Sequence, residues 1–199
     1  AMVSRLGDAE LAATNAVIQS WSVAFMGAVA LSVGATTLVG QCVGAGQPEG
    51  SRIVVRRVEK LGYLLTFVLG VIYAVFPRQL MAIFVTASEI DRVLPFARPL
   101  FLIVILCLVF DLKFNILSGA LRGAGDTKFP MYVNVLSAWL LFVPALLIVT
   151  PRFGLIGAWA CFILHVFVMA VALELRVRGK RWLLEPQFRS DGLRESLAN

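Results

Sequence analysis

The sequence predicts an all-α membrane protein, a polytopic transmembrane helical bundle with five spans. Of its 199 residues, 59% are hydrophobic and only 15% are charged, whereas an average soluble domain has about 25% charged residues. The apolar residues form five continuous runs, and each is long enough to supply the roughly 20 residues that a membrane-crossing helix needs. Continuous runs exclude a transmembrane β-barrel, because its strands alternate apolar and polar residues.

Proline and glycine separate the five predicted spans. The first run is long for one span, so its helix must tilt or extend beyond the bilayer. The stretch 78–98 is too charged to cross, and its apolar residues at 80–84 predict a short amphipathic helix at the outer interface. In chain order, the predicted spans are 11–43, 60–77, 99–121, 129–149 and 154–175.

Three residues predict how individual helices end or bend. Gly44 and Gly123 follow apolar runs, and each is predicted to end its helix because glycine adopts positive φ without steric cost. Pro144 lies inside the fourth run and predicts a kink. Beyond the last run, Trp182 is predicted to anchor the chain at the interface, and residues 183–199 form a polar tail.

The basic residues predict the orientation of the bundle. Twelve of the 18 lysines and arginines lie near 46–59, near 122–128 or after the last span, and Lys113 lies inside a span. Because lysine and arginine collect in cytoplasmic loops, those loops and the C-terminus are predicted to be cytoplasmic, in a bacterial inner membrane. The pI of about 9.7 therefore does not indicate a nucleic-acid partner. An odd number of spans places the N-terminus outside, which predicts a preceding helix.

Two segments, 40–46 and 119–125, share the pattern GxxxGAG, and a polar residue follows each. Small residues four apart allow two membrane helices to approach closely. The pattern therefore predicts close packing at one end of two spans, and the alternative interpretation is a gating hinge. It does not fit a nucleotide-binding loop, because the glycine spacing differs and a helix precedes it.

Asp111 is the most informative single residue. It lies near the middle of the third span, where a carboxylate costs about 2.5–3.5 kcal/mol on insertion scales. Other polar or small side chains share its helix face, so this face is predicted to meet a cavity or another helix: Cys107, Asn115, Ser118 and Arg122. Two interpretations remain, a cation or substrate site and an acid that hydrogen-bonds between helices. Lys113 points away, and it either snorkels or pairs with an acid on another helix.

Other polar residues inside the spans have alternative roles. A face of the first span either lines an aqueous cavity or makes hydrogen bonds between helices, and the fourth span carries a smaller patch. These residues are Asn15, Gln19, Ser22 and Met26 on the first span, and Asn134 and Ser137 on the fourth. His165 is interpreted as a core histidine with satisfied hydrogen bonds, and Glu174 with Arg178 as an interfacial ion pair.

Signals for enzyme chemistry are missing from the sequence. It contains neither a GxSxG elbow nor an HExxH or Walker motif, and its single histidine cannot build a multi-histidine metal site. The three cysteines have neither disulfide-framework nor zinc-ligand spacing. We therefore expect a protein that is not an enzyme and that needs no cofactor.

Four segments in order resemble the multidrug and toxic compound extrusion (MATE) family. They are LGDAELAATN at 6–15, LVGQCVGAG at 38–46, LRGAGDTKFP at 121–130 and GLIGAWACF at 154–162. The resemblance implies that residues 1–182 form part of the C-terminal lobe of a two-lobed, twelve-helix transporter, equivalent to helices eight to twelve. The missing partners would be the N-terminal lobe and one further helix.

The resemblance also implies a function. Asp111 matches the tenth-helix aspartate that is implicated in cation binding in the sodium-coupled bacterial branch, although Cys107 stands where that branch has a tyrosine. The expected activity is antiport, in which amphiphilic organic cations leave the cell as Na⁺ or H⁺ enters. Asp111 would bind Na⁺ if that is the coupling ion, and no other metal site is expected. The alternatives are a lipid-linked oligosaccharide flippase and a truncated, non-transporting membrane fragment.

Overall fold

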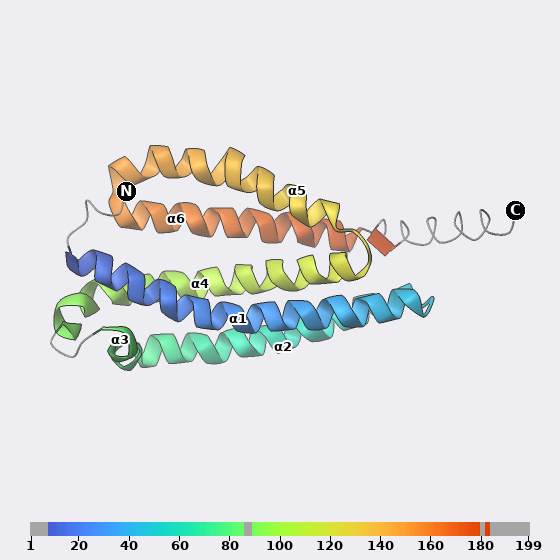
Figure 1. Ribbon diagram of the computed structural model, residues 1–199, viewed down its shortest axis with the longest axis horizontal. Helices are drawn as coiled ribbons and strands as arrows, with labels where there is room; N and C mark the ends of the chain where they lie inside the picture. Colours follow the sequence, from blue (N-terminus) through green and yellow to red (C-terminus); the bar gives the residue numbers. More distant parts are fainter. Residues whose placement is uncertain (1–7, 86–88, 180–181, 184–199) are drawn as a thin grey trace, which may run out of the picture.

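The computed structural model describes residues 8–85, 89–179 and 182–183, and in these ranges it contains helices and no strand (Figure 1). The elements are α1 (Asp8–Gly44), α2 (Pro48–Val75), α3 (Pro77–Phe84), α4 (Ile90–Gly123), α5 (Lys128–Leu136), the π-helical η2 (Ser137–Phe142) and α6 (Val143–Arg178). Five described segments are long and apolar enough to cross a membrane: Ala12–Gly44, Pro48–Val75, Ile90–Gly123, Lys128–Gly154 and Ile156–Arg178. The fold class predicted from the sequence is confirmed.

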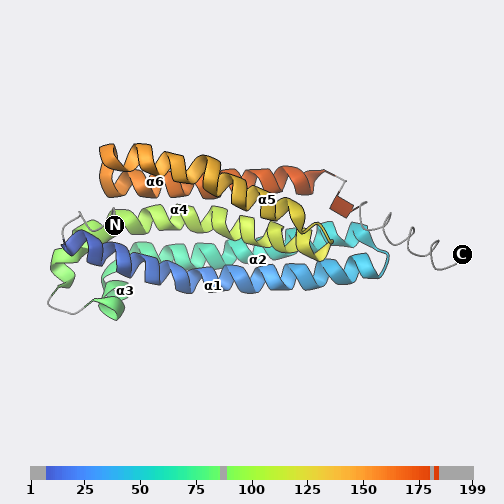
Figure 2. The same ribbon diagram turned by 45° about the horizontal axis from the view of Figure 1, so that its top comes forward.

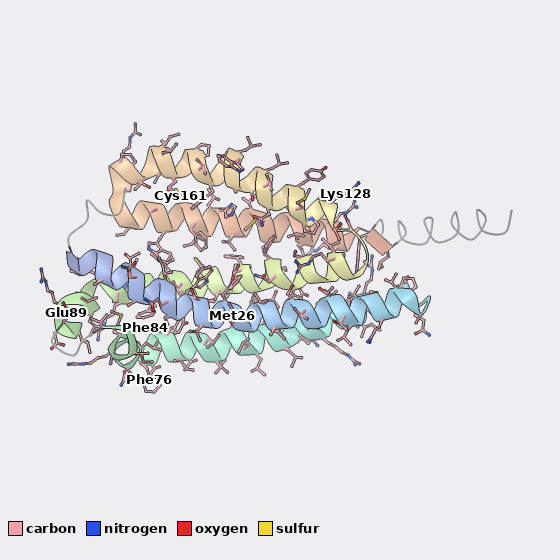
Figure 3. All side chains as sticks on the ribbon, viewed as in Figure 1. Met26, Phe76, Phe84, Glu89, Lys128 and Cys161 are labelled. Carbon is pink, nitrogen blue, oxygen red and sulfur yellow. The ribbon has the colours of Figure 1, made fainter. Side chains whose placement is uncertain are left out.

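The helices lie side by side along the long axis, with α4 in the middle (Figures 1 and 2). The helices α1 and α2 pack on one side of α4, and α6 packs on the other. The ends of α1 and α4 and the starts of α2 and α5 meet at one end of the bundle, which is called the basic end below. The labelled side chains of Lys128 and Phe84 mark the basic end and the opposite end (Figure 3). Both predicted basic loops therefore lie at the same end.

The short helix α3 confirms the amphipathic helix expected at 80–84. It begins at Pro77, and proline is favoured in the first turn because its missing N–H needs no partner there. Met81 is fully buried, whereas Ile83 is 71% exposed. The helix thus lies with one face on the bundle, against the start of α4.

Two predicted helix starts were wrong. The second helix begins at Pro48 rather than near 60, so most of the stretch 46–59 is helical instead of a loop. Proline in the first turn and Glu49 beside it form a helix-start signal, and the charges that follow share the helix with buried Val55 and Val58. The helix of the third predicted span, α4, begins at Ile90 rather than near 99.

The early start of α4 needs a physical reason, because Pro95 and Pro99 lie inside it. Each removes a backbone hydrogen bond and crowds the preceding turn. The helix nevertheless continues, and Val93, Phe101 and Val104 on its buried face are at most 2% exposed. Tertiary packing therefore outweighs the local preference of proline here.

The bend expected near Pro144 takes the form of a π-helical segment. Residues Ser137–Phe142 are π-helical and end two residues before Pro144. The proline ring would crowd the carbonyl group four residues earlier, and a wider turn relieves that contact. Helix α6 turns back at Gly154, where φ is 59° and the backbone is not helical. This turn separates the fourth and fifth spans, which therefore pack as a hairpin.

The predictions for the two glycine helix ends were correct in place and wrong in mechanism. Gly44 and Gly123 are the last residues of α1 and α4, but positive φ occurs two residues later, at Gly46 (70°) and Gly125 (89°). At the first end, the backbone N–H of Gly46 donates to Val43 and that of Gln47 donates to Cys42, at 3.0 and 2.9 Å. This pair of bonds is a Schellman cap.

Trp182 corrects a further prediction. Its side chain is fully buried, and its indole Nε1 donates to the Val177 carbonyl oxygen at 2.8 Å. It packs with Val39, Leu121 and Leu173 in an apolar cluster near the basic end, so it is a core residue and not an interfacial anchor. Apart from Leu183, the predicted polar tail lies outside the described residues.

Candidate functional site

Close contact between α1 and α4 positions the site. A Cβ atom added to Gly119 would collide with the backbone carbonyl of Ser32, and one added to Gly123 would collide with that of Thr36. The Thr36 hydroxyl donates to the carbonyl oxygens of both Ser32 and Gly119, each at 2.9 Å. The second GxxxG pattern therefore forms the close helix contact that the sequence predicts.

A chain of hydrogen bonds runs along this contact. Arg122 Nη2 donates to Ser32 Oγ at 3.0 Å, and Ser32 Oγ donates to the Asn115 carbonyl oxygen at 2.7 Å. Asn115 Nδ2 donates to Asp111 Oδ1 at 3.2 Å and to the Asp111 backbone oxygen at 2.9 Å. Thus α1 links three members of the predicted polar face of α4 into one network.

The carboxyl group of Asp111 is the chemically distinctive part of this network. The residue is only 6% exposed. While Oδ1 accepts from Asn115, Oδ2 is buried and has no hydrogen-bond partner among the described residues. A buried ionised carboxylate is costly unless a cation or a proton neutralises it. The arrangement therefore suits reversible binding of a small cation at Oδ2.

The other members of the predicted face are buried but less connected. Cys107 is fully buried and Ser118 is 7% exposed. The sequence analysis missed Ser32 and Thr36, which complete the network from α1. The available signal was their spacing of four residues within a stripe of small residues that also includes Ala28 and Ala35, both buried.

Lys113 belongs to a separate cluster. Its Nζ atom lies 3.1 Å from Glu174 Oε2, so the residue pairs with an acid on α6, one of the two alternatives expected. Arg178 Nε lies 2.7 Å from the other oxygen of Glu174, which confirms the predicted i,i+4 pair. The three charges join α4 to α6, and Lys113 is already engaged there.

The remaining candidate polar residues lie on the surface of the described bundle. Asn15, Gln19 and Asn134 are exposed, and Met26 on the same face of α1 is 64% exposed (Figure 3). The hydroxyl of Ser22 donates to the Ile18 carbonyl of its own helix at 2.9 Å. In the described part of the chain, Asn15 and Gln19 make no hydrogen bond between helices. Their cavity-lining role stays a prediction.

His165 differs from the expected satisfied core histidine. It is 7% exposed and makes a hydrogen bond with the backbone of Ser137. Its Nδ1 atom, however, is buried without a partner among the described residues. The imidazole ring lies 5.1 Å from the Phe142 ring. The histidine is therefore only half satisfied, with one ring nitrogen left without a described partner.

An aromatic hollow of about 260 Å³ lies between α1 and the hairpin of the last two spans. Trp21, Phe162 and Trp159 line it, and Phe162 makes edge-to-face contacts with both tryptophans at 5.8 and 6.2 Å. The Trp21 Nε1 atom is buried without a described partner. The electron-rich faces of tryptophan rings attract organic cations. The sequence analysis did not identify this hollow, because its rings come from helices far apart in the chain.

Comparison with known proteins decides the family. The MatE family model matches residues 1–148. This chain belongs to the MATE family. The family resemblance is thereby confirmed, with three of the four sequence motifs inside the matched residues, and the chain is a multi-pass membrane protein. The finding also fits a protein that is not an enzyme, since the related proteins described next are named for drug resistance.

Curated relatives of this MATE chain include the probable multidrug resistance protein NorM of Thermotoga maritima, which is 31% identical over 81% of this chain and 34% of its own length. The probable multidrug resistance protein NorM of Rhizobium meliloti is 31% identical over 88% of this chain and 38% of its own. The multidrug resistance protein MdtK of Yersinia pseudotuberculosis is 31% identical over 92% of this chain and 40% of its own. This chain therefore spans between a third and two fifths of these relatives.

A solved structure shares the fold. The crystal structure of the eukaryotic MATE transporter AtDTX14 matches with a TM-score of 0.77 and 21% sequence identity. The match covers 90% of this chain and 40% of the AtDTX14 chain. The arrangement of five spans is thus a known part of a MATE transporter fold.

Proposed function

We propose that this chain forms part of the C-terminal lobe of a transporter that exports drugs and other amphiphilic organic cations by alternating access. The inward flow of Na⁺ or H⁺ would drive export. The family and the multidrug resistance names of the relatives support the proposal. In this assignment residues 1–182 belong to the lobe, and 183–199 form a cytoplasmic tail.

The observation that carries the proposal is the buried carboxyl group of Asp111. One oxygen is held by Asn115, and the other has no described partner. A proton or a cation at Oδ2 would neutralise the charge, and so would a cationic substrate close to it. If these ligands exclude one another, binding of the ion on one side of the membrane releases the substrate there. Exclusive occupancy of one charge gives antiport when the transporter changes orientation only with this site occupied.

Asn115 would position this carboxyl group. Its side chain donates to Oδ1 while its own backbone oxygen accepts from Ser32 on α1. A movement of α1 relative to α4 would therefore change the surroundings of Asp111. This connection links a helix displacement to ion occupancy, which alternating access requires.

The two coupling ions make different demands on the site. A proton needs only the lone pair of Oδ2. Na⁺, as transported cargo, would need Oδ2 and further oxygen ligands from carbonyl groups, hydroxyl groups or water.

The aromatic hollow supports an organic cation as substrate. Trp21 and Trp159 present ring surfaces in a nearly apolar lining, which fits the flat, apolar body of such a molecule. Cation–π contact contributes about 0.5–2 kcal/mol, depending on how far water is excluded. This feature would accept many compounds, because ring surfaces impose little geometric selection.

The flippase alternative is not favoured. A lipid-linked oligosaccharide carries phosphate and calls for several free cations in the cavity. The two cations that follow Asp111 on α4 are engaged elsewhere, Lys113 with Glu174 and Arg122 with Ser32. The relatives' names also point to drug resistance. A non-transporting fragment remains the competing outcome of the following test.

The test replaces Asp111 in the transporter that contains this segment. Asp111→Asn keeps the shape and removes the charge, so we expect normal insertion and loss of ion-driven efflux in proteoliposomes. Separate imposed Na⁺ and pH gradients identify the coupling ion in the unchanged protein. Asp91→Asn is the matched control, since Asp91 is 76% exposed and pairs with Arg78 at the opposite end. Efflux by Asp111→Asn with unchanged ion dependence would contradict the proposal.

A further inference from the structure

Most basic side chains around the basic end have partners inside the protein. Those that are engaged with described groups are Arg52 with the Gly179 carbonyl, Lys113 and Arg178 with Glu174, Arg122 with Ser32, and Arg176 with Asp126. Lys128, at the start of α5, has no such partner, and Arg57 and Lys60 on α2 form neither an ion pair nor a hydrogen bond with any described residue. Arg56, next to them on α2, interacts only electrostatically, with Glu59. The three side chains on α2 are all exposed.

These three cations surround one hollow. It has a volume of about 430 Å³, and its lining also includes Tyr63, which is 40% exposed and offers a hydroxyl group. A second hollow of about 330 Å³ adjoins it and shares Arg56 and Glu59. The net charge of the lining is positive, because Glu59, its acidic member, also interacts with Lys113 of α4. Exposed cations without counter-ions around a hollow fit a bound anion.

Along one face of α2, which we call the stripe, the cationic residues are followed by exposed apolar residues. Residues 57, 60, 64, 67 and 71 follow the spacing of a single helix face. The last three, Leu64, Phe67 and Val71, are 61%, 69% and 43% exposed. At a rise of 1.5 Å per residue, the ten residues after Lys60 span about 15 Å, which is half of the hydrocarbon core of a bilayer. The face therefore combines a cationic site with an apolar path as long as one leaflet.

We propose that Arg56, Arg57 and Lys60 bind the phosphate group of an anionic phospholipid whose acyl chains lie along Leu64, Phe67 and Val71. The arginine guanidinium groups match phosphate oxygens geometrically, and clusters of basic residues beside a membrane helix attract anionic lipid headgroups. The apolar path distinguishes a lipid from a soluble phosphate, since only a lipid satisfies both halves of the stripe. This site is separate from Asp111 and does not depend on the proposed function.

The experiment measures lipid binding by the transporter that contains this segment, purified in detergent. Phosphatidylglycerol, phosphatidylcholine and soluble glycerol 1-phosphate are titrated separately, and binding is followed by native mass spectrometry and by the unfolding temperature. We expect phosphatidylglycerol to bind and to raise the unfolding temperature, and the other two to do neither. Because each basic residue near the surface contributes about 1 kcal/mol, the triple variant Arg56→Gln/Arg57→Gln/Lys60→Gln should bind about 100-fold more weakly.

The matched control removes three exposed cations from the opposite end of the bundle, Arg92→Gln/Arg98→Gln/Arg152→Gln. It makes the same change in net charge and should keep the phosphatidylglycerol effect. If the first triple variant does not fold, Arg57→Gln/Lys60→Gln, which keeps the Arg56–Glu59 interaction, should still bind at least tenfold more weakly. Unchanged phosphatidylglycerol binding in that double variant would overturn the proposal. The proposal would also be overturned if glycerol 1-phosphate raised the unfolding temperature as much as phosphatidylglycerol does. It would be overturned as well if the variant lost a co-purifying polypeptide instead of a lipid.

Discussion

The two GxxxGAG segments end their helices in the same way but pack differently. Each forms a Schellman cap. At the end of α4, Gly125 donates to Arg122 and Asp126 donates to Leu121, just as Gly46 donates to Val43 and Gln47 to Cys42 at the end of α1. At the second segment, Gly119 and Gly123 lie directly against the backbone of α1. At the first, a Cβ added to Gly44 would meet nothing within 4 Å, and one added to Gly40 would make ordinary contact at 3.5 Å.

The difference separates what a motif encodes from what its surroundings add. The cap depends on local backbone conformation, which the Gly-Ala-Gly sequence supplies wherever it occurs. Close helix packing requires a partner backbone at a short distance. Gly119 and Gly123 of α4 both have one, whereas in the first segment Gly40 has only an ordinary contact with the Gly123 carbonyl oxygen. The two identical sequence patterns therefore share a local role, the helix cap, but they differ in a tertiary role, the close helix packing.

The largest expected effect comes from filling the close contact. Gly119→Ala places a methyl group against the Ser32 carbonyl, which is backbone and cannot move aside, so we expect a loss of about 1–3 kcal/mol in the free energy of unfolding. Gly40→Ala is the matched change in the first segment and should be neutral or slightly stabilising, since alanine favours helix. Unfolding of the purified transporter in micelles titrated with sodium dodecyl sulfate measures both. Equal losses would remove the distinction between the segments.

The caps should respond alike. Gly46→Ala and Gly125→Ala each force a side chain into positive φ, at 70° and 89°, and each should cost about 1–2 kcal/mol. The same titration gives both values. A cost at one position only would show that the two caps are not equivalent, and would weaken the local half of the comparison.

The smallest expected effect comes from one hydroxyl group. Thr36→Val keeps the shape and removes the hydrogen bond to the Gly119 carbonyl, and bonds between membrane helices contribute about 0.6 kcal/mol on average. Thr37→Val is the control, because that hydroxyl group is exposed and bonds only to Val33 of its own helix, at 3.0 Å. Similar losses in the two variants would indicate that the bond between helices adds nothing measurable.

The contrast also explains what the sequence could predict. The number of spans, the short amphipathic helix α3 and the Glu174–Arg178 pair depend on local composition and spacing, and these predictions were confirmed. The start of α2 was misplaced because charges at 52–60 obscured the helix-start signal at Pro48. The partner of Lys113, the role of Ser32 and the aromatic hollow could not be predicted, because each joins residues from helices far apart in the chain.

Asp111 shows the same limit at the candidate site. Its position in the helix and its polar face predicted either a cation or substrate site or an acid that hydrogen-bonds between helices. The sequence left open whether the face meets a cavity or another helix, and the structure shows that it meets another helix, α1. Asn115 and Arg122 connect to α1 through Ser32, while Asp111 keeps one buried oxygen without a described partner. The coupling ion itself stays a proposal.

The most direct test of the central proposal measures exchange at Asp111 without transport. A cationic drug is added to the detergent-purified transporter in weak buffer, and released protons and displaced ²²Na⁺ are counted per protein. We predict release of one ion of one kind by the unchanged protein and none by Asp111→Asn, whereas Asp91→Asn should behave like the unchanged protein. Undiminished ion release by Asp111→Asn would contradict the assignment of the coupling site to this carboxyl group.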